Sequence, residues 1–88
     1  MRRSVGGFTF YLGNRDAGLP RLGMLVTRKH APHATDRNRI KRCIREAFRH
    51  EQAWLGSLDV LVRPPYGARG DARMLTQLRD AFQKLGDR

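Results

Sequence analysis

The segment RNRIKRCIREAFR, at residues 37–49, holds six positive charges and one negative charge. Its apolar residues recur at the spacing of one face of an α-helix. These residues are Ile40, Cys43, Ile44, Ala47 and Phe48. We therefore expect a helix from residue 37 to about residue 53, capped by Thr35 or Asp36. Such a helix must lay its apolar stripe on another element, so the rest of the chain has to supply an apolar surface.

The other side of this predicted helix is positively charged. At about 100° per residue, five polar side chains fall within about 100° of arc. They are Asn38, Lys41, Arg42, Arg45 and Arg49, with Arg39 on the flank and Arg37 in the first turn. A solvated helix face usually mixes the signs of its charges, because opposite charges four residues apart stabilise a helix. Here like charges are neighbours, and Glu46 can relieve only Arg42 or Arg49, so the row indicates a phosphate-bearing ligand.

Alternation of apolar and polar residues predicts strands at 7–13, 21–28 and 58–63. The turn-rich segment 13–20 predicts a hairpin loop between the first two strands. Asp71 is expected to cap a last amphipathic helix that ends near residue 85.

The element order β-β-α-β-α predicts an α+β protein, a two-layer α/β sandwich with both helices on one face of the sheet. The opposite face of the sheet would be polar and open to a ligand. Its side chains would be Thr9, Tyr11, Thr27 and Arg63. With 88 residues, we expect a single domain over residues 1–88.

The net charge of +10, from 18 Lys and Arg against 8 Asp and Glu, points to a polyanionic partner. Fifteen of those cations are Arg, whose planar fork grips phosphates and stacks on bases, so nucleic acid is favoured over a membrane. No apolar run is long enough for a membrane span or a signal peptide. The single cysteine, Cys43, is expected to be a buried apolar side chain and fits a reducing, cytoplasmic location.

The residues give little support for metal binding or acid–base catalysis by the polypeptide. His30 and His33 lack further ligands for a metal site, and as loop residues they are expected to lie near RNA phosphates. The acidic residues are scattered, with no pair suited to acid–base catalysis. Trp54 is expected to pack against the edge of the core. We therefore expect neither catalytic residues nor a metal site in the polypeptide.

The motif RNRIKRCIREAFR resembles the signature of the bacterial ribonuclease P protein component. The segment TRKHAPHATDRNR resembles the approach to that signature, and RLGMLVTRK, LDVLVRP and the last helix follow in the family's order. The resemblance extends from Phe8 to Leu85. It implies the family's left-handed β-α-β crossover (the ribosomal protein S5 domain 2-like fold), although right-handed crossovers are the general rule.

The resemblance also implies a function. In this family the RNA subunit carries the catalysis that removes 5′ leaders from precursor tRNA. The protein binds the RNA subunit and the leader, and Mg²⁺ is bound by the RNA–protein complex rather than by a protein site. The RNA-binding positions are then Arg28, Lys29, Arg37, Asn38, Arg39, Lys41, Arg42, Arg45 and Arg49. Tyr11 matches an aromatic residue of the leader-binding cleft, to which we also assign Thr9.

Family members usually begin with a longer segment whose apolar helix helps to wall the cleft, whereas here the first predicted strand begins almost at once. The chain is interpreted either as shortened or as a minimal member. Two alternatives to a processing role remain. One is a general module for structured RNA, of the ribosome-associated type. The other is a DNA-binding domain with residues 37–53 in the major groove, which is less favoured because groove-reading helices usually mix Asn, Gln and Ser with their basic residues.

Overall fold

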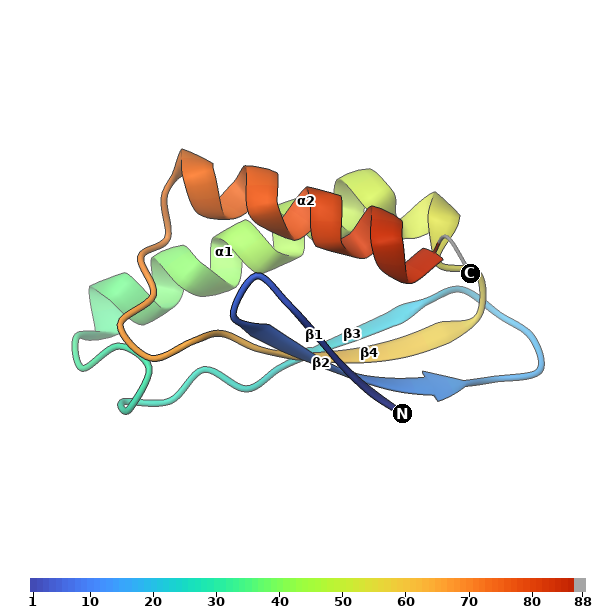
Figure 1. Ribbon diagram of the computed structural model, residues 1–88, viewed down its shortest axis with the longest axis horizontal. Helices are drawn as coiled ribbons and strands as arrows, with labels where there is room; N and C mark the ends of the chain where they lie inside the picture. The colour runs from blue at the N-terminus through green and yellow to red at the C-terminus, as the bar shows by residue number, and fades with distance from the viewer. Residues whose placement is uncertain (87–88) are drawn as a thin grey trace.

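The computed structural model describes residues 1–86, which form a four-stranded sheet and two α-helices (Figure 1). The strands are β1 (Arg2–Val5), β2 (Phe8–Asn14), β3 (Arg21–Met24) and β4 (Leu58–Arg63). The helices are α1 (Ala34–Glu51) and α2 (Ala72–Gly86), and the short 3-10 helix η1 (Gln52–Trp54) follows α1. The predicted order β-β-α-β-α is confirmed, with β1 as an additional strand in front of it.

The first two strands form a hairpin that the sequence pattern did not predict. β1 pairs antiparallel with β2, and Val5 lies opposite Phe8. The two residues between them, Gly6 and Gly7, have φ values of 59° and 86°. Tight two-residue hairpin loops favour such left-handed conformations, which glycine adopts without a steric penalty.

The strand order of the sheet is β1-β2-β4-β3. β4 lies between β2 and β3, antiparallel to the first and parallel to the second. The prediction that segment 13–20 joins two paired strands is therefore wrong. The parallel pair is connected through α1, as a β-α-β unit requires, and its left-handed sense stays a prediction.

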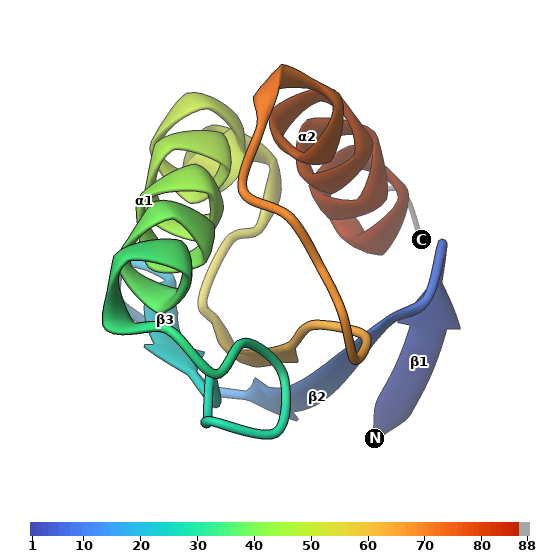
Figure 2. The same cartoon turned by 90° about the vertical axis from the view of Figure 1, so that its left-hand side faces the viewer.

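Both helices cover the same face of the sheet, which confirms the two-layer sandwich (Figures 1 and 2). In Figure 2, α1 lies above the β3 side of the sheet and α2 lies toward the β1 side. The other face of the sheet carries no helix of the described chain. No helix within residues 1–86 is long and apolar enough to cross a membrane.

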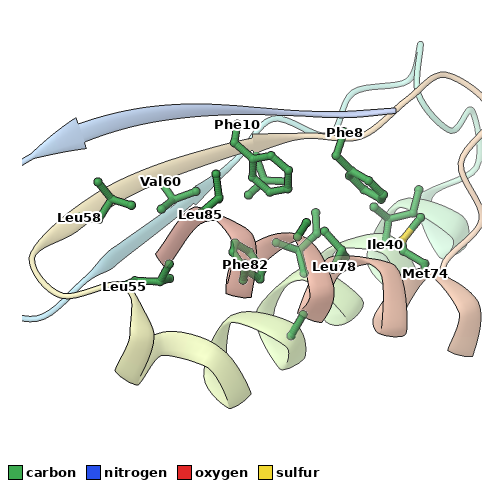
Figure 3. Packing of buried hydrophobic residues seen from close by; sticks show 14 of the residues in the cluster. Phe8, Phe10, Ile40, Leu55, Leu58, Val60, Met74, Leu78, Phe82 and Leu85 are labelled. Carbon is green, nitrogen blue, oxygen red and sulfur yellow. The ribbon is translucent and has the colours of Figure 1, made fainter. Parts of the chain in front are cut away.

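The core lies between the two layers and is built mainly from aromatic and branched apolar side chains (Figure 3). Phe82 of α2 makes edge-to-face contacts with Phe10 of β2 and Phe48 of α1, with ring centroids 5.7 and 5.9 Å apart. Burying such a side chain fully is worth about 1.5–3 kcal/mol. One ring thus joins both helices to the sheet and fixes which face of α1 points inward.

The two helices begin differently. α1 starts at Ala34, with His33 at the N-cap and no side-chain cap, so the prediction of Thr35 or Asp36 as the cap is wrong. Pro32 disfavours helical geometry only at the residue before it, and the helix can therefore begin soon after the proline. For α2 the prediction is confirmed, because the backbone N–H of Met74 donates to Oδ1 of Asp71 at 3.0 Å.

Candidate nucleic-acid interface

Helix α1 has the two faces that its sequence predicts. Ile40, Ile44 and Ala47 are completely buried against the sheet and α2. The polar row on the other side is exposed except for Lys41, which is half-buried. The exposed members are Asn38, Arg42, Arg45 and Arg49, and the flanking Arg39 is exposed as well.

One cation of the row is paired within the helix. Arg49 donates from Nε to Oε2 of Glu46 at 3.3 Å, and Nε2 of His50 lies 3.0 Å from Oε1 of the same carboxylate. The hydrogen bond from Arg49 lowers the pKa of Glu46 and raises the pKa of Arg49. The pair is therefore charged at neutral pH, and Arg49 offers only part of its charge to a ligand.

The remaining cations of the helix surface have no acidic partner. Among residues 1–86, none of Arg39, Lys41, Arg42 and Arg45 forms an ion pair. Three of these four side chains are exposed. A series of unpaired cations along one helix is the arrangement that neutralises successive phosphates of a nucleic-acid backbone.

Arg37, in the first turn of α1, has a different environment from the cations of the row. Its Nη1 donates to the carbonyl oxygens of Ala31 and Pro32 at 3.0 and 2.9 Å. The side chain is half-buried and fastens the segment before α1 to the first turn of the helix. Its guanidinium thus positions the N-terminus of α1 as well as adding charge there.

Arg28 and Lys29 lie on a turn and not on the predicted strand. β3 ends at Met24. The N–H of the next residue, Leu25, still donates to the carbonyl of Val62 at 2.9 Å, and after it the chain leaves the sheet. The turn is closed by the N–H of His30, which donates to the carbonyl of Thr27 at 3.0 Å. Both basic side chains are exposed. The turn that carries them lies at the end of the molecule where α1 begins (Figure 1).

His30 is buried, with 4% of its surface exposed, and the expectation that it lies near RNA phosphates stays a prediction. Its Nδ1 accepts a hydrogen bond from the backbone N–H of Thr27 at 3.0 Å. Burial, and secondarily the charge of Arg63, lowers the pKa of His30. The ring is therefore neutral at physiological pH and holds the turn that presents Arg28 and Lys29.

The face of the sheet away from the helices is less polar than predicted. Tyr11 is half-buried and lies between Arg2 of β1 and Leu61 of β4. Neither of these two neighbours was predicted for this face. Thr9 is buried, and its Oγ1 accepts from Nη2 of Arg63 at 3.4 Å. The assignment of Thr9 to an open cleft is therefore wrong, and Thr27 is not part of the sheet at all. Tyr11 remains, beside the exposed Leu61.

The exposed fractions of Trp54 and Cys43 bear on the predictions made for these two side chains. Trp54 is exposed, so the expectation that it packs on the core edge is wrong. Cys43 is half-buried against the core, and its Sγ lies 3.6 Å from the carbonyl oxygen of Asp71. Burial raises the pKa of this thiol, which therefore stays protonated at neutral pH. In the described part of the chain, no three His, Cys, Asp or Glu side chains are grouped so that they could hold a metal ion.

Comparison with known proteins identifies relatives over nearly the whole chain. The family model named Ribonuclease P matches residues 2–86. The ribonuclease P protein component of Nitrosococcus oceani is 48% identical over 61 residues, which are 69% of this chain and 51% of that protein. The protein component of Thioalkalivibrio sulfidiphilus is 37% identical over 84 residues, 93% of this chain and 70% of that protein. The chain thus spans only about half the length of some of its curated relatives.

Solved structures show the same fold. The RNase P protein of Staphylococcus aureus superposes with a TM-score of 0.75 at 26% identity, covering 97% of this chain and 76% of that one. The RNase P protein of Thermotoga maritima superposes with a TM-score of 0.78 at 23% identity, covering 96% and 82%. By sequence and by fold, this chain belongs to the ribonuclease P protein family.

Proposed function

We propose that this chain acts as the protein subunit of ribonuclease P, and that it binds the catalytic RNA subunit and the 5′ leader of precursor tRNA. In this role it assists the endonucleolytic removal of the leader. The observation that carries the proposal is the series of exposed, unpaired cations on α1, opposite the face that packs on the sheet, in a chain that belongs to this family.

The chemistry of the surface suits a ligand whose sequence varies. Arg39, Arg42 and Arg45 can each form two parallel hydrogen bonds to a phosphate, which reads the backbone and not the bases. Arg28 and Lys29 extend the same charge beyond the N-terminus of α1. Tyr11 offers an aromatic surface on the sheet, where stacking is worth about 1–3 kcal/mol per base.

In this proposal the reaction itself belongs to the RNA. The chain supplies cations that offset repulsion between the phosphates of the RNA subunit and those of the precursor tRNA. Mg²⁺ is held by the assembled complex through RNA phosphates, which are the oxygen ligands that this ion prefers. We place the complex in the cytoplasm.

Reconstitution tests the proposal. The chain is added to a bacterial ribonuclease P RNA at low Mg²⁺ concentration, and cleavage of precursor tRNA is followed. A longer family member serves as the positive control for the RNA. The proposal predicts faster cleavage with the wild-type chain and little gain with a variant in which Arg39, Arg42 and Arg45 are all Ala. No gain from the wild-type chain, where the longer member does accelerate cleavage, would contradict it.

A general module for structured RNA is the second candidate, because the row of cations carries no evident means of reading a sequence. Such a module would bind precursor tRNA and leaderless tRNA equally in the presence of the RNA subunit. The subunit proposed above would favour the precursor and protect its leader from a single-strand nuclease. If duplex DNA competed for binding as effectively as RNA, the result would instead support the DNA-binding alternative.

A further inference from the structure

His30, which holds the turn before α1, also forms an aromatic pair with Tyr66 of the loop after β4. The rings of His30 and Tyr66 are stacked, with centroids 5.1 Å apart and planes inclined by 14°. His30 is buried, whereas Tyr66 is 71% exposed. One face of the tyrosine ring therefore rests on the histidine while much of the side chain stays open to solvent.

The pair is held in place from both sides. His30 is fixed by the hydrogen bond from the N–H of Thr27 to Nδ1, and its own carbonyl accepts from the N–H of Gly67 at 3.1 Å. The loop that carries Tyr66 follows Pro64 and Pro65 and is closed by the N–H of Ala68, which donates to the carbonyl of Pro65 at 3.3 Å. The tyrosine ring is thus a preorganised surface, and little conformational freedom is lost when a ligand stacks on it.

A pocket lined by charges of both signs adjoins this pair. It has a volume of about 430 Å³ and lies between the segment before α1 and the loop that leads into α2. Its lining includes His30, the cations Arg39 and Arg69, and the carboxylates Asp36 and Asp71. The carboxylate of Asp71 is engaged as the cap of α2, where it accepts from the N–H of Met74. Both arginines are exposed, and neither forms an ion pair within residues 1–86. Figure 2 shows the two segments and the start of α1 together at the end that faces the viewer.

The same pair also lies next to the open face of the sheet. Arg63 of β4 is close enough to His30 for its charge to act on that ring, and it donates to Thr9 on β2. Arg39 belongs to the basic helix and lines the pocket. The stacked pair therefore lies where the basic helix and the open sheet face come together.

We propose that Tyr66 stacks on an unpaired nucleobase of bound RNA, and that Arg39 and Arg69 receive the adjoining phosphate. An aromatic ring backed by a second ring, next to a pocket that holds two cations without ion-pair partners, resembles the combination that binds single-stranded nucleic acid without regard to sequence. This inference rests on the proposed RNA binding and assigns a specific base-stacking position to it.

Photocrosslinking tests the contact directly. The probes are a single-stranded leader oligonucleotide in one arm and the ribonuclease P RNA in the other, each with 5-iodouridine in place of uridine. Irradiation couples the modified base to an aromatic side chain that stacks on it, and mass spectrometry of the digested protein locates the bond. We expect a crosslink at Tyr66 in at least one arm, and the arm identifies the RNA. Crosslinks confined to Tyr11 or other residues would overturn the inference.

Affinity measurements with matched variants complete the test. Tyr66→Ala is expected to weaken binding of the crosslinked RNA about 5- to 150-fold, while Tyr66→Phe keeps the ring and stays near wild type. Tyr66→Leu covers His30 without an aromatic face, so it separates loss of stacking from loss of fold and is expected to behave like Tyr66→Ala. Trp54→Ala, at the other end of α1, is the control for an exposed aromatic side chain and is expected to change nothing.

The result also separates this inference from the proposed function. RNA binding that keeps its full salt dependence and is equally tight for Tyr66→Leu and Tyr66→Phe would overturn the stacking position alone. RNA binding that is absent or independent of salt in the wild-type chain would overturn both.

Discussion

The guanidinium groups along α1 differ in how much of their charge a ligand can use. Arg37 is engaged by two carbonyl oxygens and Arg49 by Glu46, whereas Arg42 and Arg45 are exposed and unpaired. The sequence could place these cations on one face, because helical periodicity is local. It could not show which of them have partners, since the geometry of Arg37 depends on the loop before the helix.

Removal of the acid in this row is expected to strengthen RNA binding. Glu46→Gln frees Arg49 and removes a negative charge, so the slope of log affinity against log salt should steepen by about 0.7–0.9. Asp80→Asn is the matched control, because it frees Lys84 from an equivalent ion pair of 3.2 Å on α2. Equal effects of the two variants would mean that binding responds to total charge and not to this helix face.

His30 is expected to make the stability of the fold depend on pH. Its pKa is lowered by burial and by Arg63, while an unfolded histidine titrates near pH 6.5. Below about pH 6.5 the unfolded chain therefore binds more protons than the folded chain, so the free energy of unfolding falls as the pH falls. Above that pH the contribution is fully present.

Urea denaturation between about pH 7.5 and pH 5.5 measures this effect. His30→Asn can still accept a hydrogen bond but does not titrate, so its loss of stability over this range should be smaller than that of the wild type. His33→Asn, at an exposed position, should behave like the wild type. The acids with lowered pKa values, Glu46 and Asp59, titrate below this window. If the stability of His30→Asn depended on pH as strongly as that of the wild type, another group would be responsible for the effect.

For the helices and strands, local sequence patterns predicted the type of each element. Contacts between residues far apart in the sequence decided how the strands pair. The bounds of β4 were predicted correctly from its alternating residues. β1 was missed because RRSV has no apolar alternation, although the glycine pair that follows it is a recognised hairpin signal. The pairing of β3 with β4 joins residues far apart in the sequence, and nothing local to segment 13–20 shows that another strand will lie between its neighbours.

The loop before α2 packs directly on the backbone of α1. A Cβ atom at Gly70 would lie 2.5 Å from the carbonyl carbon of Arg39 and 2.7 Å from the nitrogen of Ile40. Gly70→Ala is therefore expected to destabilise the protein by about 1–3 kcal/mol, as overpacking of a buried contact does. Gly13→Ala, where a Cβ atom meets only ordinary contact at 3.9 Å, should leave the denaturation midpoint nearly unchanged. Similar midpoints for the two variants would show that loop and helix can separate freely.

The whole molecule presents two surfaces on opposite sides of one sheet. The helix layer carries the row of cations, the open sheet face carries Tyr11 and Leu61, and the turn with Arg28 and Lys29 lies at the end where α1 starts. The two-layer architecture and the basic helix were predictable from the sequence. The burial of Thr9 was not, because it depends on Arg63, a residue 54 positions away.

The salt dependence of binding to ribonuclease P RNA shows whether the exposed cations of α1 contact phosphates. If Arg39, Arg42 and Arg45 each neutralise one phosphate, replacing all three by Ala should reduce the slope of log affinity against log salt by about 2–3. All three side chains are exposed, so the variant should keep the wild-type fold and unfolding midpoint. A folded triple variant with the slope and affinity of the wild type would show that this face of α1 is merely solvated, and would contradict the account.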